Sequence, residues 1–164
     1  MEIKLEKETL ITSKTDLKGC ITYANYDFIK YAGYTLEQLI GKPHNMVRHE
    51  DMPKTVFKYL WDYIKEGKEI FAFVKNKSKN GDFYWVFANV TPSKNISGEI
   101  VGYYSVRRKP NELAIKNIEE LYSKLLEIEK KEGLNAACAQ LQGFCDEKQK
   151  SYNELIFALQ HLQE

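Results

Sequence analysis

Four adjacent ionisable residues, Arg48-His49-Glu50-Asp51, form a short segment of the chain that is bounded by prolines. Arg48 and His49 are potential cations that could bind a diphosphate, and Asp51 could hold one of them in place. A polar loop with a surface salt bridge explains the same residues, and such a salt bridge contributes little to stability. The residue types therefore indicate either an anion site or a solvated loop, and their spacing does not decide between the two.

Other chemistry receives little support from the sequence. His44, His49 and Asp51 are three metal-ligand types within one loop, but no cysteine pair accompanies them and the pattern is weak. No Ser/His/Asp or Cys/His arrangement stands out, and the glycines form no phosphate-binding loop or nicotinamide fingerprint. We expect no metal site and no catalytic residues, and we do not expect an enzyme.

A second group of candidate residues lies on one predicted strand. In the segment from Phe83 to Thr91, alternation puts Trp85, Phe87 and Asn89 on the same face. An amide aligned with two aromatic rings suits a pocket for a flat heterocycle, which would stack on the rings and bond to Asn89. An ordinary sheet with Asn89 exposed near the strand end explains the pattern equally well.

The elements that must position these residues are mixed α and β. Strand-like runs are expected at 9–13, 19–24, 70–76, 83–91 and 100–107, with Asn80-Gly81 as a hairpin turn. Asn25 is expected to cap a short helix, and an amphipathic helix is expected to begin at Met52-Pro53 and to end at Gly67. This order predicts an α+β fold, in which a five-stranded antiparallel sheet carries short helices on one face.

The composition changes after Lys109-Pro110, so we divide the chain into a domain at 1–110 and a helical extension at 111–164. One apolar stripe ends near Gly133. A second stripe has heptad spacing and one polar member, Lys148: Leu134, Cys138, Leu141, Cys145, Lys148, Tyr152, Leu155, Leu159 and Leu162. Two helices, or one helix with a register shift, are expected. Two isolated helices could not bury both stripes, which favours a homodimer or docking to a partner helix.

Charge and composition exclude several classes of protein. Twenty-four Lys and Arg nearly balance twenty-three Asp and Glu, so nothing favours nucleic acid or a membrane surface as the main partner. No apolar run approaches the roughly twenty residues of a membrane span, and the charged N-terminus does not suit a signal peptide. The three cysteines form no CxxC pair, as is typical of a reducing compartment. We therefore expect a cytoplasmic protein that does not insert into a membrane.

The sequence strongly resembles the PAS domains of bacterial aerotaxis receptors. The resemblance runs through 16–25 and 33–53, where the ten residues HNMVRHEDMP begin at His44, and continues in KNGD at Lys79 and YWV at Tyr84. It covers roughly residues 9 to 108. As a whole, the chain is similar to stand-alone energy-taxis proteins of the CetB type, in which the PAS domain is a separate chain.

This resemblance implies a PAS fold that binds FAD without covalent attachment and reports redox state. It assigns FAD-binding positions to Arg48, His49 and Asp51, puts Trp85 and Asn89 beside the isoalloxazine, and puts Asn25 at the pocket entrance. Many relatives have Trp before the VKN string, where this chain has Ile70. The loss of that ring would weaken flavin binding or change its redox tuning.

Aerotaxis receptors also carry a membrane anchor and a signalling coiled coil, and neither is seen in this sequence. The resemblance therefore implies a separate, membrane-bound chemotaxis transducer of the methyl-accepting type, which would recruit this chain to the inner face of the membrane. The alternative function is a PAS adaptor or dimerisation module without a cofactor. Ile70 favours that alternative, and the intact set of Arg48, His49 and Asp51 opposes it.

Overall fold

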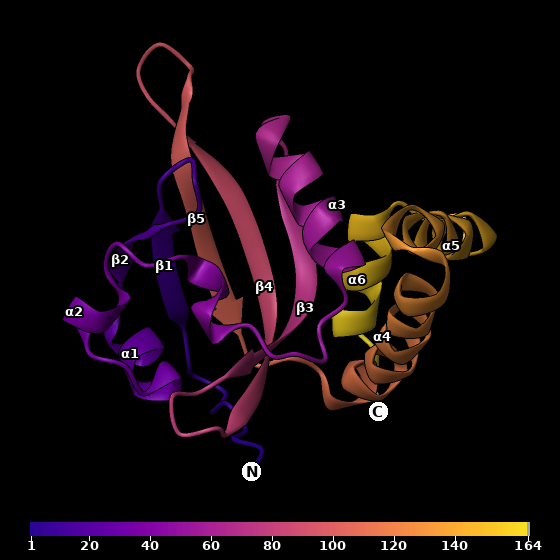
Figure 1. Ribbon diagram of the computed structural model, residues 1–164, viewed down its shortest axis with the longest axis horizontal. Helices are drawn as coiled ribbons and strands as arrows, with labels where there is room; N and C mark the ends of the chain where they lie inside the picture. The colour runs from indigo at the N-terminus through magenta and orange to yellow at the C-terminus, as the bar shows by residue number, and fades with distance from the viewer. Residues whose placement is uncertain (164) are drawn as a thin grey trace.

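The computed structural model describes residues 1–163 and shows a twisted antiparallel sheet flanked by helices (Figure 1). The sheet has five strands in the order β2-β1-β5-β4-β3. Their bounds are β1 Ile11–Thr15, β2 Ile21–Ala24, β3 Ile70–Lys77, β4 Phe83–Lys94 and β5 Ile100–Arg108. The predicted α+β class and the five-stranded antiparallel sheet are confirmed.

Four helical segments connect β2 to β3, and three more follow β5. The first group is α1 Tyr26–Ala32, α2 Leu36–Leu39, the 3₁₀ helix η1 His44–Val47, and α3 Lys54–Lys65. The second group is α4 Glu112–Glu132, α5 Leu134–Glu147 and α6 Tyr152–Gln160. Across residues 1–163, none of the helices combines the length and the apolar character that crossing a membrane requires.

Local sequence signals determine where several of these elements begin and end. The Asn25 side chain accepts the Phe28 N–H at 3.0 Å and caps α1, as predicted. Asn80-Gly81 forms the β3–β4 turn with Gly81 at a φ of 93°. Gly102 permits a close approach, because a Cβ there would lie 2.3 Å from the Thr15 carbonyl oxygen on β1. Asn25 and Asn80-Gly81 were predicted from the sequence, whereas the role of Gly102 depends on its approach to β1.

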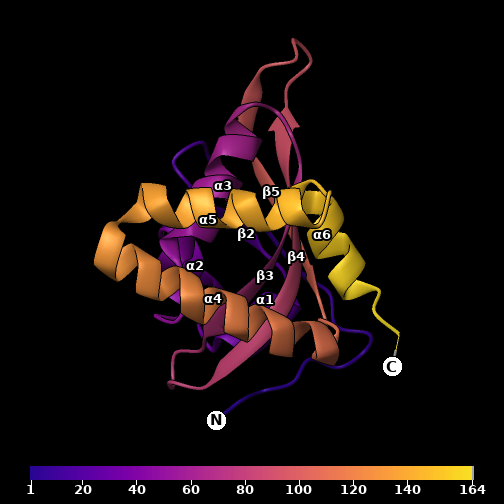
Figure 2. The same cartoon turned by 90° about the vertical axis from the view of Figure 1, so that its right-hand side faces the viewer.

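The two faces of the sheet are covered by different parts of the chain. Helix α3 packs on the face that carries alternate residues of β3 and β4 such as Val74 and Ala88. The C-terminal helices pack against the opposite face and the β3 edge, where Phe71, Phe73 and Trp85 meet them (Figures 1 and 2). Helices therefore cover both faces of the sheet, because the C-terminal extension packs on the face opposite α3.

The extension contains three helices rather than two. Gly133 separates α4 from α5 as expected, but a second turn at 148–151 separates α5 from α6. Gln149 in that turn has a φ of 54°, and Ser151 starts α6 with a capping box. The predicted heptad seam is therefore divided between two helices, and the two halves of the stripe are buried inside the chain at Leu141, Cys145 and Leu155.

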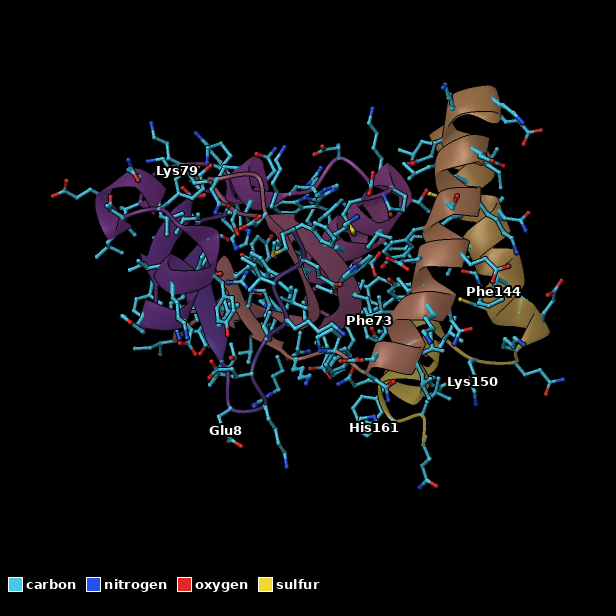
Figure 3. The ribbon with its side chains drawn as sticks, turned by 90° about the horizontal axis from the view of Figure 1, so that it is seen from below. Glu8, Phe73, Lys79, Phe144, Lys150 and His161 are labelled. Carbon is cyan, nitrogen blue, oxygen red and sulfur yellow. The ribbon has the colours of Figure 1, made fainter. Side chains whose placement is uncertain are left out.

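Specific hydrogen bonds attach the extension to the sheet. The Tyr122 hydroxyl donates to the Phe73 carbonyl at 2.5 Å, and both groups are buried. Asn153 accepts the Phe71 N–H at 2.9 Å and donates to the Glu69 carbonyl at 3.0 Å, so its amide pairs with the free edge of β3. Phe73 lies at the boundary between the sheet and the C-terminal helices (Figure 3).

Candidate ligand cavity

A cavity of about 180 Å³ lies between α3 and the sheet and is partly open to solvent. Helix α3 lines it with Phe57, Leu60, Trp61 and Ile64. The strands contribute mainly small or polar side chains, which are Ser13, Thr15, Val74, Asn76, Ala88, Val90, Tyr103, Ser105 and Arg107. An apolar helix wall therefore faces a sheet surface that mixes small apolar residues with polar ones, and ligand pockets commonly combine apolar walls with a few polar groups in this way.

The strand register explains why these residues share one face. Arg107 of β5 lies opposite Ala88 of β4 and Ile11 of β1, and Ser105 lies opposite Val90 and Ser13. Directly opposed residues in an antiparallel sheet point to the same side. The alternation along each strand therefore brings Arg107 to the cavity from a position that is distant in sequence.

Arg107 is the centre of a buried polar cluster in this cavity. Its guanidinium donates to His44 Nε2 at 2.8 Å and to Ser13 Oγ at 2.9 Å, and Ser13 Oγ lies 2.9 Å from the same His44 nitrogen. Only 4% of Arg107 is exposed, and its Nε is buried without a hydrogen-bond partner. Burial lowers the pKa of Arg107 to about 10, so the guanidinium remains charged at neutral pH.

His44 is a neutral acceptor in this cluster. Burial, reinforced by the nearby charge of Arg107, lowers the pKa of His44 to about 3. Because an arginine can only donate, the geometry assigns Nε2 as the acceptor and leaves the proton on Nδ1. The Phe28 ring lies below the cluster, with the Arg107 Cζ 4.6 Å from its centroid.

Arg48 is the second cation at the cavity. Its Cζ lies 3.5 Å from the centroid of the Phe57 ring on α3, and its Nε is buried without a hydrogen-bond partner. Desolvation lowers the pKa of Arg48. Among residues 1–163, the carboxylates near this segment pair with lysines and with His49 and not with Arg48 or Arg107.

Comparison with known proteins assigns this architecture to a family. A model described as the PAS fold matches residues 21–107, which is more than half of the chain. The chain belongs to the PAS family. It is 46% identical over 121 residues to the aerotaxis receptor of Escherichia coli, a match that covers 74% of this chain and 24% of the receptor. This PAS domain therefore spans about a quarter of that relative's length.

The chain is also similar to two further proteins. A nitrogen fixation regulatory protein of Klebsiella pneumoniae is 27% identical over 104 residues, covering 63% of this chain and 21% of that protein. The dark structure of the blue-light photoreceptor Aureochrome1 LOV superposes with a TM-score of 0.57 at 24% identity, covering 73% of this chain and 86% of that chain. The structural match is evidence for the fold alone.

The side chains of the segment Arg48-His49-Glu50-Asp51 do not share one site in the PAS domain. The backbone of Arg48 pairs with Asn76 at the β3 edge, and the His49 N–H donates to the Lys75 carbonyl. Neighbouring residues therefore point to opposite sides of that edge, with Arg48 in the cavity. The Asp51 carboxylate accepts the Lys75 ammonium at 2.6 Å outside the cavity.

His49 belongs to this outer cluster. Its Nδ1 accepts the Asp51 N–H at 3.0 Å and lies 3.6 Å from the Asp51 carboxylate. Desolvation, followed by the charge of Lys75, lowers the pKa of His49. His44 is in the cavity and His49 is outside it, and residues 1–163 contain no group of three acidic, His or Cys side chains placed to hold a metal ion.

Trp85 and Asn89 lie on the sheet face opposite the cavity. Trp85 packs against Tyr122 of α4 with ring centroids 6.1 Å apart, and Asn89 is within 3.4 Å of the Glu69 carboxylate. The expectation that this face of β4 lines the pocket is wrong, because the cavity takes the alternate residues Ala88 and Val90. Two aromatics aligned with an amide indicated burial, but the burial is beneath the C-terminal helices.

Asn25 has a structural position near the start of α1. Besides capping the helix, its side chain accepts the Thr12 N–H at 3.0 Å and donates to the Leu10 carbonyl at 2.7 Å. All three of these contacts are to the backbone, and Asn25 does not line the cavity. Arg107, Ser13 and Asn76 were not predicted from the sequence. Alternation along β5 puts Arg107 on the same face as Tyr103 and Ser105, and this pattern could have indicated Arg107.

Proposed function

We propose that this PAS domain binds FAD non-covalently in the cavity and acts as a redox sensor for energy taxis. The observation that carries the proposal is a pair of guanidinium groups at the cavity, buried Arg107 and half-buried Arg48, each of which has a buried Nε atom without a hydrogen-bond partner. Buried donors of this kind are costly unless an acceptor is supplied. The 46% identity to an aerotaxis receptor supports FAD as the source of that acceptor.

The residues at the cavity fit such a group. Arg48 would take an anionic oxygen such as a diphosphate oxygen, because its guanidinium has no carboxylate partner within residues 1–163. Trp61 and Tyr103 pack edge to face with their ring centroids 5.5 Å apart, and together they provide an aromatic wall beside the apolar Leu60 and Val90. When bound, FAD would supply a flat ring that accepts electrons and protons.

His49 and Asp51 have a supporting role in this proposal. The Asp51–Lys75 ion pair and the backbone bond from His49 to Lys75 fasten the segment to the β3 edge. That attachment directs the Arg48 side chain into the cavity. Asn89 would not bond to a ligand in this cavity, as the sequence suggested, because it lies on the opposite face of the sheet.

The signal would leave the cavity through α3. This helix contributes four lining residues and also contacts the extension, where the Tyr59 hydroxyl donates to the Cys138 carbonyl at 3.3 Å. We propose that the extension passes the change to a separate membrane-bound transducer of the methyl-accepting type. The protein would then be cytoplasmic and act without substrate turnover, as a stand-alone energy-taxis protein of the CetB type. A homodimer through the extension remains part of this proposal.

The visible spectrum of the purified protein tests the proposal. We expect the absorption bands of oxidised flavin, release of FAD on denaturation, and one FAD per chain after reconstitution. Arg48→Ala should lose most of this FAD, whereas Arg108→Ala, an exposed arginine outside the cavity, should keep it. A full chain that is folded by circular dichroism and takes up no FAD would overturn the proposal.

A PAS adaptor without cofactor is the second candidate, and Ile70 is the observation that favours it. Ile70 is fully buried and lies opposite Val90 on the cavity side of β3, where many relatives have Trp. A branched aliphatic residue there removes a ring that could stack on a ligand. The adaptor would bind its partner with the same affinity whether or not FAD is added, which a pull-down with the transducer would detect.

A further inference from the structure

Resting on the proposed function, we infer that Arg107 is the fixed positive charge of the cavity, positioned by His44 and Ser13 to stabilise the flavin ring when it carries a negative charge. Arg107 and Ser13 lie outside the segment HNMVRHEDMP, and His44, the first residue of that segment, is not among the FAD-binding residues Arg48, His49 and Asp51 that the sequence predicts. The inference therefore assigns a tuning residue to β5, on the other side of the cavity from α3.

The geometry of Arg107 is that of a charge held in place. Two of its nitrogens are occupied by His44 and Ser13 at 2.8 and 2.9 Å, and its Cζ lies over the Phe28 ring at 4.6 Å from the ring centroid. The third nitrogen, Nε, is buried without a partner. A side chain fixed at three points cannot turn to solvent, so its remaining donor is available only inside the protein.

The charge of Arg107 is not neutralised by the protein. His44 is neutral and Ser13 is uncharged, and the other ionisable groups that bear on this cluster are Tyr84 of β4 and Arg48. Burial raises the pKa of Tyr84 to about 12, so its hydroxyl is neutral as well. Within residues 1–163, no carboxylate forms an ion pair with Arg107. An uncompensated buried cation stabilises whichever ligand state brings negative charge to it.

For a flavin, this preference selects the protonation state of the reduced ring. A chemical reductant such as dithionite delivers two electrons, and the oxidised ring then takes up either two protons to become neutral or one proton to become an anion. Arg107 favours the second outcome. The groups facing it do not titrate near neutral pH, since the pKa of His44 is about 3 and that of Tyr84 about 12. A change in proton uptake there reports on the flavin.

The midpoint potential of bound FAD, measured by dithionite titration at several values of pH across the neutral range, tests the inference. In the wild type, the slope should correspond to one proton per two electrons, about 30 mV per tenfold change in proton activity. At high proton activity the slope is the two-proton value of about 59 mV, and it changes to the one-proton value where the reduced ring loses a proton. In Arg107→Gln, this change of slope should occur at a proton activity about tenfold lower, or lower still, than in the wild type. Arg107→Lys should stay close to the wild type because it keeps the charge.

Arg108→Gln is the matched control, because Arg108 is the next residue of β5, is exposed and points away from the cavity. It should behave as the wild type does. Equal potentials and equal slopes in the wild type and Arg107→Gln would overturn the inference and leave the proposed function standing. A wild type that takes up no FAD would overturn both. If Arg107→Gln fails to fold, a two-proton slope across the neutral range in the wild type alone would still overturn the inference.

Discussion

The carboxylate of Glu129 on α4 accepts the backbone N–H of Lys54, the first residue of α3, at 3.0 Å. Its other oxygen accepts the Thr55 N–H at 3.3 Å. Helix α3 begins after Pro53, which has no side-chain cap of its own. A residue seventy-five positions away therefore satisfies the free N–H groups of the helix that lines the ligand cavity.

Glu129→Ala should destabilise the protein by about 0.5–2 kcal/mol, the usual cost of losing a helix cap. Glu129→Gln should cost less than Glu129→Ala because glutamine keeps one acceptor oxygen, but it should still cost some stability because it loses the negative charge that favours the N-terminal end of the helix dipole. Urea unfolding followed by circular dichroism measures both. Glu127→Ala on the same helix is the control, because Glu127 is exposed, and a loss of equal size there would contradict the capping role.

Tyr122→Phe should destabilise the attachment of the extension to the sheet by about 1–3 kcal/mol, because the buried Phe73 carbonyl would lose its Tyr122 donor. The ring packing on Trp85 would remain, so the fold should be kept. Thermal unfolding of the variant is the measurement. Tyr26→Phe, at a side chain that is 76% exposed, should leave the melting temperature unchanged. Equal melting temperatures for all three proteins would refute the expected role of this bond.

Asn76 and Asn89 form a matched pair on opposite faces of the sheet. Asn76 is 4% exposed and lines the cavity, whereas Asn89 faces the other side near Glu69. Asn76→Ala should weaken FAD binding by about tenfold, equivalent to about 1.4 kcal/mol, and Asn89→Ala should change it by less than about twofold. Titration of apoprotein with FAD, followed by quenching of FAD fluorescence, gives both affinities. A larger loss of FAD affinity in Asn89→Ala than in Asn76→Ala would indicate that FAD binds to the sheet face that contains Trp85.

The lowered pKa of His44 should make the free energy of unfolding decrease in acid. Its folded pKa of about 3 is below the ordinary value of 6.5, so the unfolded chain binds a proton at this residue over that range and the folded chain does not. The stability contributed by neutral His44 is complete above about pH 6.5 and falls as the pH decreases toward 3. Between pH 7 and pH 5 the loss should be about 2 kcal/mol.

Urea unfolding at the two pH values measures this loss. His44→Gln should reduce it, because glutamine does not titrate. His161→Gln, at an exposed histidine, should retain the full loss. A wild type and a His44→Gln variant with the same pH dependence would show that His44 is not the group responsible.

Much of this architecture follows from local sequence. Asn25 caps a helix, Asn80-Gly81 turns a hairpin, and Gly133 ends a helix, because each depends on contacts or backbone angles within a few residues. The strands were predicted because β-branched and aromatic residues alternate between turns. Arg48 was selected by its residue type and its place in a specific motif, and it does line the cavity.

Only the tertiary structure decided which sheet face carries the cavity. Period-two alternation separates Trp85 and Asn89 from Ala88 and Val90, but it does not say which set faces α3. That choice depends on the C-terminal helices, whose packing onto Phe73 and Trp85 takes one face and leaves the other for α3 and the ligand. The Arg107–His44–Ser13 cluster arises in the same way, because the pairing of β1 with β5 and the packing of η1 join residues 31 to 94 positions apart. The sequence by itself determined the elements and the family pattern, and long-range packing determined the site.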